Sequence, residues 1–163
     1  MPKPAIPVGR IALIWTLFGA LLAASATAQS PAPSPSEFLG FTLGDRFSLH
    51  HEVVDFTEAL SENPGVSLVE YGKSYEGRPL HALVFTHPDY ADRLEDIRAQ
   101  HIDRIEGGTG DAEFDELAVV WMSYNVHGNE AVCTESALEV MHALALRCAA
   151  GDPIMKRLVV FAK

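Results

Sequence analysis

The sequence contains only two cysteines, Cys133 and Cys148, and both fall within one predicted helix. Fifteen residues of straight helix span about 22 Å, whereas a disulfide requires Cα atoms within about 7 Å of each other. We therefore expect no internal disulfide, although the N-terminus predicts an oxidising destination.

Basic residues are also scarce, since 12 Lys and Arg stand against 22 Asp and Glu and give a net charge of -10. Nucleic-acid-binding domains carry a basic surface, so nothing in the composition indicates a nucleic-acid partner. The glycine cluster at 107–110 lacks the preceding strand and following helix of a phosphate-binding loop. No internal repeat is visible, and 163 residues with 48% hydrophobic content predict one globular domain.

The apolar run near the N-terminus, residues 11–24, is shorter than the roughly 20 residues that a membrane-spanning helix needs. Two basic residues precede it, and Ala26-Thr27-Ala28 follows it as a small-x-small cleavage site. We therefore predict that residues 1–28 are a signal peptide and that the mature chain begins at Gln29. The mature protein is expected to be secreted or periplasmic, without a stable membrane anchor.

Residues 29–40 are rich in Pro and Ser and predict an extended linker, followed by a folded part over 41–163. Apolar periodicity predicts two helices in the first half of this part, at 48–63 and 89–105. Short apolar runs predict strands at 66–71, 80–86, 117–122 and 158–162. A further helix is predicted to run to about residue 147. This pattern predicts an α/β fold, with a mixed sheet and helices on both faces.

The stretch from Leu117 to Met141 is predicted to form a strand, a turn and a helix, and the functional prediction rests on this stretch. Its first six residues are apolar and rich in β-branched and aromatic side chains, which predicts a strand buried on both faces. The predicted strand at 158–162 is expected to be buried on its faces while leaving an edge exposed. Between the first strand and the helix that follows it lie His127 and Glu130. Ligands of open α/β sheets bind at this carboxyl end of the strands.

An imidazole and a carboxylate at this place suit zinc, because catalytic zinc sites use three such protein ligands and a water. Gly128 would give the turn a backbone shape that other residues resist, and Asn125 or Asn129 could orient a ligand. An isolated His and Glu three apart also fit a loop histidine and a carboxylate that favours a helix N-terminus. The strand before and the helix after favour the metal site.

Other candidate metal-binding side chains are interpreted as structural. The neighbours His50 and His51 point in different directions on a helix and are expected to be solvated. Cys133 is expected to be a small buried core residue. His142 lies about 18 Å along the helix axis from Glu130, too far to share its metal.

Two stretches resemble one known family. The segment from Tyr124 to Glu130, YNVHGNE, is similar to the HxxE zinc motif of the zinc carboxypeptidases. The segment from Tyr71 to Leu80, YGKSYEGRPL, resembles the strand-turn-strand that precedes that motif in the same family. The resemblance covers roughly residues 41–163, which would form the N-terminal part of a zinc carboxypeptidase domain.

This resemblance implies that His127 and Glu130 are zinc ligands and that the substrate is a peptide or protein losing its C-terminal residue. It also implies a third ligand, a general-base Glu and a carboxylate-binding Arg, all beyond Lys163, so that the sequence is an incomplete and inactive fragment. No catalytic residue is expected within the chain. Many relatives carry an Arg where this chain has Asn129, so that Arg's role does not transfer here.

Two alternatives remain open. The HGNE sequence also occurs in the N-acyl-amino-acid deacylases of the aspartoacylase and succinylglutamate desuccinylase group. A non-catalytic binding module that keeps the architecture without zinc is the other.

Overall fold

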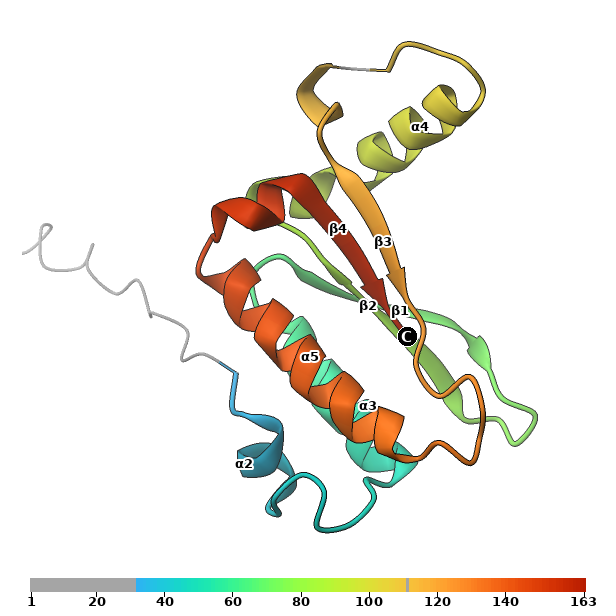
Figure 1. Ribbon diagram of the computed structural model, residues 1–163, viewed down its shortest axis with the longest axis vertical. Helices are drawn as coiled ribbons and strands as arrows, with labels where there is room; N and C mark the ends of the chain where they lie inside the picture. Colours follow the sequence, from blue (N-terminus) through green and yellow to red (C-terminus); the bar gives the residue numbers. More distant parts are fainter. Residues whose placement is uncertain (1–31, 111) are drawn as a thin grey trace, which may run out of the picture. The chain divides into compact units, whose positions relative to one another are not determined.

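The computed structural model describes residues 32–110 and 112–163. The predicted signal peptide, residues 1–28, lies outside the described residues and stays a prediction. Figure 1 shows the elements in chain order: α2 (Pro35–Leu39), α3 (His50–Ser61), β1 (Val66–Lys73), β2 (Pro79–Phe85), η1 (Pro88–Arg93), α4 (Leu94–Ile105), η2 (Ala112–Phe114), β3 (Ala118–Met122), α5 (Val132–Ala149), η3 (Pro153–Arg157) and β4 (Leu158–Ala162).

The four strands of the described residues form one mixed sheet in the order β1-β2-β4-β3. The pairs β1–β2 and β2–β4 are antiparallel, and β3–β4 is parallel. Successive strand residues face opposite sides: Leu83 packs with α3 and α5, while Val84 packs with Ile97 of α4. Helices therefore cover both faces, and the predicted α/β fold is confirmed.

Helix α3 owes its place to an apolar stripe. Phe56 and Leu60 are fully buried against the sheet and α5, as their spacing predicts. Leu49, from the same stripe, precedes the helix and is exposed. The Glu52 carboxylate accepts a hydrogen bond from the Leu49 amide at 2.7 Å. A hydrogen bond from Arg46 at 2.5 Å lowers the pKa of Glu52, and together these bonds fix the first turn.

The turn from α3 into β1 requires glycine. Gly65 has φ of +78°, and a Cβ on it would lie 2.4 Å from the carbonyl oxygen of Thr86. No L side chain fits that geometry without moving the strand. The Asn-Pro-Gly sequence that predicts the end of the helix thus also sets the entry of β1.

The predicted helix at 89–105 begins differently from the prediction. Residues 88–93 form the 3-10 helix η1, and only Leu94 to Ile105 is α-helical. The His87 imidazole accepts a hydrogen bond from the Asp89 amide at 3.2 Å and caps η1. Arg93, with φ of -116°, separates the two helices.

The prediction of an extended conformation for the linker at 29–40 is wrong at its C-terminal end. Residues 35–39 form helix α2, which a capping box of Ser34 and Glu37 starts. Pro35 is buried, and Phe38 meets Phe56 edge to face with ring centroids 5.3 Å apart. His142 donates from Nε2 to the Ala32 carbonyl at 3.1 Å. Composition missed this segment because its partners lie on α3 and α5.

The prediction that the strand at 117–122 is buried on both faces is also wrong. Within the described residues β3 is an edge strand that pairs only with β4, and Trp121 is 59% exposed. The strand at 158–162, expected to offer an edge, is interior instead, with Val159 and Val160 at 1% and 3% exposure. An apolar run marks a strand but does not reveal its neighbours, so strand order is not readable from it.

The cysteines are free, as predicted. Cys148 is buried, and that burial raises the pKa of its thiol to about 11, which keeps it in the unreactive thiol form. Cys133 is half-buried rather than part of the core. No helix in the described part of the chain is long and apolar enough to cross a membrane.

Candidate metal centre

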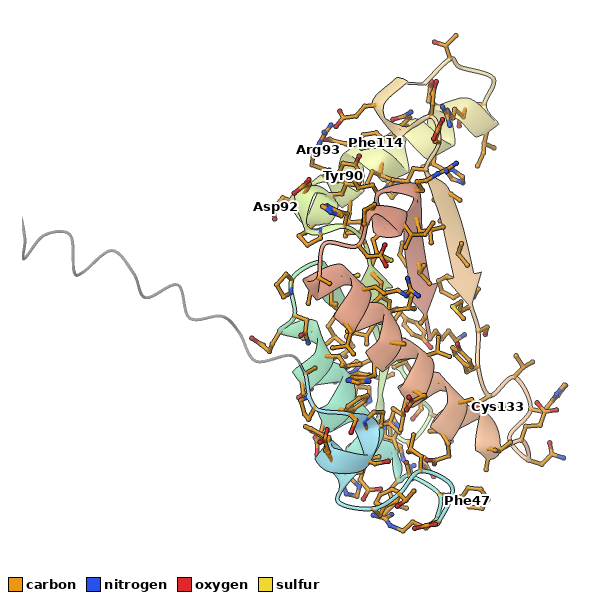
Figure 2. The ribbon with its side chains drawn as sticks, turned by 60° about the vertical axis from the view of Figure 1, so that its left-hand side comes forward. Phe47, Tyr90, Asp92, Arg93, Phe114 and Cys133 are labelled. Atoms are coloured by element: carbon orange, nitrogen blue, oxygen red, sulfur yellow. The ribbon has the colours of Figure 1, made fainter. Side chains whose placement is uncertain are left out.

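The turn that carries His127 and Glu130 lies at the carboxyl end of the parallel pair β3–β4. The Tyr124 amide donates to the Lys163 carbonyl at 3.1 Å, which continues the pairing past the end of β3. The chain then turns and enters α5 at Val132, two residues after Glu130. Figure 2 shows Cys133 at this N-terminal end of α5, close to where the turn enters it. The sheet edge and helix end thus support the turn from both sides.

The structure brings the two predicted ligands together. The Glu130 amide donates to the His127 carbonyl at 3.0 Å, which folds the backbone back on itself. His127 Nδ1 then lies 3.3 Å from Glu130 Oε2, and the side chains are 70% and 50% exposed. Two ligands about 2.1 Å from a tetrahedral zinc ion lie about 3.4 Å apart. The separation of the two atoms is therefore compatible with both binding one zinc ion.

Within residues 32–110 and 112–163, no group of three or more His, Cys, Asp or Glu side chains is placed to hold a metal. Cys133 does not complete such a group with His127 and Glu130, and His142 is engaged with Ala32 instead. Two ligands leave at least two positions of a tetrahedral ion to water or to other groups.

The backbone conformation of the turn differs from the prediction. Gly128 does not have a positive φ, and a Cβ on it would meet nothing within 4 Å. Asn125 instead has φ of 52°, a conformation that Asn tolerates better than most residues. Its side-chain amide donates to Thr134 Oγ1 at 2.5 Å. Asn129, the other predicted orienting residue, is exposed.

Glu135 is a positioning residue that the sequence did not reveal. The residue is 6% exposed, and its carboxylate accepts from the Ser48 amide at 2.8 Å and from the Ser48 hydroxyl at 3.2 Å. These bonds fasten the first turn of α5 to the segment before α3. In the sequence Glu135 resembles a solvated first-turn carboxylate, since its partner lies 87 residues away.

A pocket of about 240 Å³ lies between α3, α5 and the sheet, and Asn125 and Thr134 form part of its wall. His50 also lines it, and its Nε2 is buried without a hydrogen-bond partner in the described structure. The prediction that His50 is solvated is therefore wrong, whereas His51 is exposed as expected.

His81 lines the same pocket and is fixed in one tautomer. The Thr57 hydroxyl donates its proton to the Val54 carbonyl at 2.8 Å. It can then only accept from His81 Nδ1, which lies 3.2 Å away. A neutral His81 therefore carries its proton on Nδ1. Neither His50 nor His81 joins the His127–Glu130 pair in a group of three.

The charges of the β1–β2 turn behave as ordinary loop charges. Arg78 pairs with Glu76 at 2.7 Å, and both side chains are more than half exposed. Lys73 is exposed as well.

Comparison with known proteins finds similarity in both sequence and fold. The family model described as zinc carboxypeptidase matches residues 53–160 and so includes both predicted ligands. Among solved structures, the chain is similar to the carboxypeptidase A from Helicoverpa armigera, with a TM-score of 0.53 and 21% sequence identity. That match covers 93% of this chain but only 31% of the Helicoverpa armigera chain. No curated protein matches the sequence. Because the family model spans most of the described fold, the chain belongs to the zinc carboxypeptidase family.

Proposed function

We propose that this chain supplies two zinc ligands, His127 and Glu130, to a metallocarboxypeptidase that removes C-terminal residues from peptides. The observation that carries the proposal is the 3.3 Å approach of His127 Nδ1 to Glu130 Oε2, within the region that the family model matches. Zinc held there would supply Lewis-acid polarisation of the scissile carbonyl and a water of lowered pKa.

The two side chains have distinct tasks in this proposal. His127 would offer the Nδ1 lone pair, so its proton would reside on Nε2. Glu130 would contribute negative charge that offsets the cation. Both are exposed, so a substrate could approach them without an opening movement. The high exposure also means that packing does not hold them, and the turn itself has to set their positions.

We also propose that residues 41–163 are the N-terminal part of a longer peptidase domain. The supporting fact is that the match covers only 31% of the similar carboxypeptidase A chain from Helicoverpa armigera. The third ligand, the general base and the carboxylate-binding Arg would then be supplied by residues beyond Lys163. A carboxylate base that takes the proton of the attacking water is required for this chemistry, and Glu130 cannot serve as both ligand and base.

The substrate class can be tested on the complete protein. We expect peptides with free C-termini to lose their last residue, and amidated peptides of the same sequence to stay intact. Mass spectrometry of the products follows both. Release of acyl groups from N-acetyl or N-succinyl amino acids without peptide trimming would support the deacylase alternative. If neither peptides nor N-acyl amino acids are turned over and the purified protein contains no zinc, the result would support a binding module.

We propose that the protein acts outside the cytoplasm after cleavage following Ala28. The support is the basic start, the apolar run and the Ala26-Thr27-Ala28 site. N-terminal sequencing of secreted or periplasmic protein is expected to begin at Gln29. A product that keeps residues 11–22 within the membrane would contradict this.

A further inference from the structure

We propose that Asn125 is a positioning residue for the metal ligands and that it acts through its hydrogen bond to Thr134. The inference rests on the proposed function, in which His127 and Glu130 hold zinc. Its basis is that this one hydrogen bond between side chains joins the two ends of the turn between β3 and α5.

The backbone of Asn125 starts the turn from a fixed position. It is the one non-glycine residue with a positive φ, 52°, within the described part of the chain. Left-handed conformations are unfavourable for most L residues, and Asn is among the few that adopt them regularly. This residue follows Tyr124, whose amide is bonded to the Lys163 carbonyl. The reversal of the chain therefore begins from a point anchored to the sheet.

The side chain of Asn125 connects the start of the turn to helix α5. Asn125 Nδ2 donates to Thr134 Oγ1 at 2.5 Å, which bridges nine residues. Thr134 is the third residue of α5, a helix held down by buried Leu138 and by the Glu135–Ser48 bonds. The bond therefore joins a fixed point on the sheet to a fixed point on the helix. The closed segment contains His127 and Glu130.

The ligands need this support because little else holds them. Their side chains are 70% and 50% exposed, so core packing does not fix them. The backbone bonds of the turn are local: Glu130 to His127, and Cys133 to Glu130 at 2.9 Å. These bonds set the shape of each half of the turn. The Asn125–Thr134 bond sets the distance between its ends.

The test separates the side-chain bond from the backbone conformation. Asn125→Gly keeps access to positive φ but removes the amide. Thr134→Val keeps the side-chain shape but removes the acceptor. Thr134→Ser keeps the hydroxyl. Val126→Ala, in the same turn, is the matched control because that side chain is 70% exposed.

Zn²⁺ alone is titrated by calorimetry into the complete protein, which supplies the third ligand as well as His127 and Glu130. Each bond-removing variant is expected to weaken zinc binding by about tenfold, the usual effect of losing a partner that orients metal ligands. The double variant is expected to lose no more than either single one, since both remove the same bond. Thr134→Ser and Val126→Ala are expected to stay within about twofold of the unaltered protein.

A second measurement does not depend on the metal. Amide hydrogen exchange over residues 126–133 is expected to accelerate in Asn125→Gly and Thr134→Val, but not in Thr134→Ser. Circular dichroism and thermal unfolding verify that each variant is folded. If Thr134→Val does not fold, the zinc affinity and hydrogen exchange of Asn125→Gly test the inference.

The outcomes distinguish the two proposals. If His127→Ala and Glu130→Ala leave zinc binding unchanged, the proposed function fails. If those two weaken binding but Asn125→Gly and Thr134→Val do not, the zinc site stands and the positioning role of Asn125 is overturned. If Thr134→Ser is as weak as Thr134→Val, the hydroxyl is not the acting group and the inference is likewise overturned.

Discussion

Replacing His127 or Glu130 by alanine is expected to lower the zinc affinity of the complete protein by at least about 100-fold and to abolish peptidase activity. A catalytic zinc site has three protein ligands, and each substitution would leave two. The loss of affinity should exceed the roughly 10- to 100-fold effect of removing an orienting partner, because a metal–ligand bond is lost outright. Calorimetry and a C-terminal trimming assay measure the two effects.

The matched controls are His51→Ala and Glu139→Ala. Both side chains are exposed and belong to α3 and α5, the same helices that frame the site. Zinc affinity and activity are expected to stay within about twofold in these controls, because exposed substitutions away from special features have small effects. If activity survives both His127→Ala and Glu130→Ala, the assignment of the two ligands is wrong.

Phe56→Ala is expected to lower the free energy of unfolding by about 3–5 kcal/mol, the usual cost of removing a fully buried aromatic side chain. Phe56 has no exposed surface, packs in the core between α3, α5 and the sheet, and meets Phe38 of α2. Urea denaturation followed by circular dichroism measures the change. Phe56→Leu is a milder variant, expected to cost less than Phe56→Ala because it removes fewer buried atoms, and keeps the test informative if the alanine variant unfolds.

Phe47 provides the matched control for Phe56. It is 65% exposed and lies in the segment before α3, at the opposite end of the view from Tyr90 and Phe114 in Figure 2. Phe47→Ala is expected to change stability by less than about 0.5 kcal/mol. If Phe56→Ala costs under 1 kcal/mol, α3 is not packed on the sheet as described.

Local sequence patterns predicted most of the elements, because period and turn residues act over a few positions. The stripe containing Phe56 and Leu60 identified α3, and the apolar run at 158–162 identified β4 with the observed bounds. The HxxE spacing, with a strand before it and a helix after it, singled out two side chains that the turn does bring within 3.3 Å of each other, and their role as zinc ligands stays a prediction.

The features that sequence reasoning missed depend on contacts between distant residues. Trp121 is exposed because β3 lies at the edge, and strand order follows from pairing rather than from composition. Helix α2 was predicted as linker because its support comes from Phe56 and His142. The unusual backbone was predicted at Gly128 because glycine is the general choice, whereas the structure has it at Asn125, whose side chain bonds to Thr134.

The most direct test of the zinc assignment is anomalous X-ray diffraction at the zinc absorption edge from zinc-loaded crystals of the complete protein. One strong anomalous peak is expected between the two side chains, about 2.0–2.2 Å from His127 Nδ1 and from a Glu130 carboxylate oxygen. A peak elsewhere, with His127 and Glu130 free of metal, would contradict it.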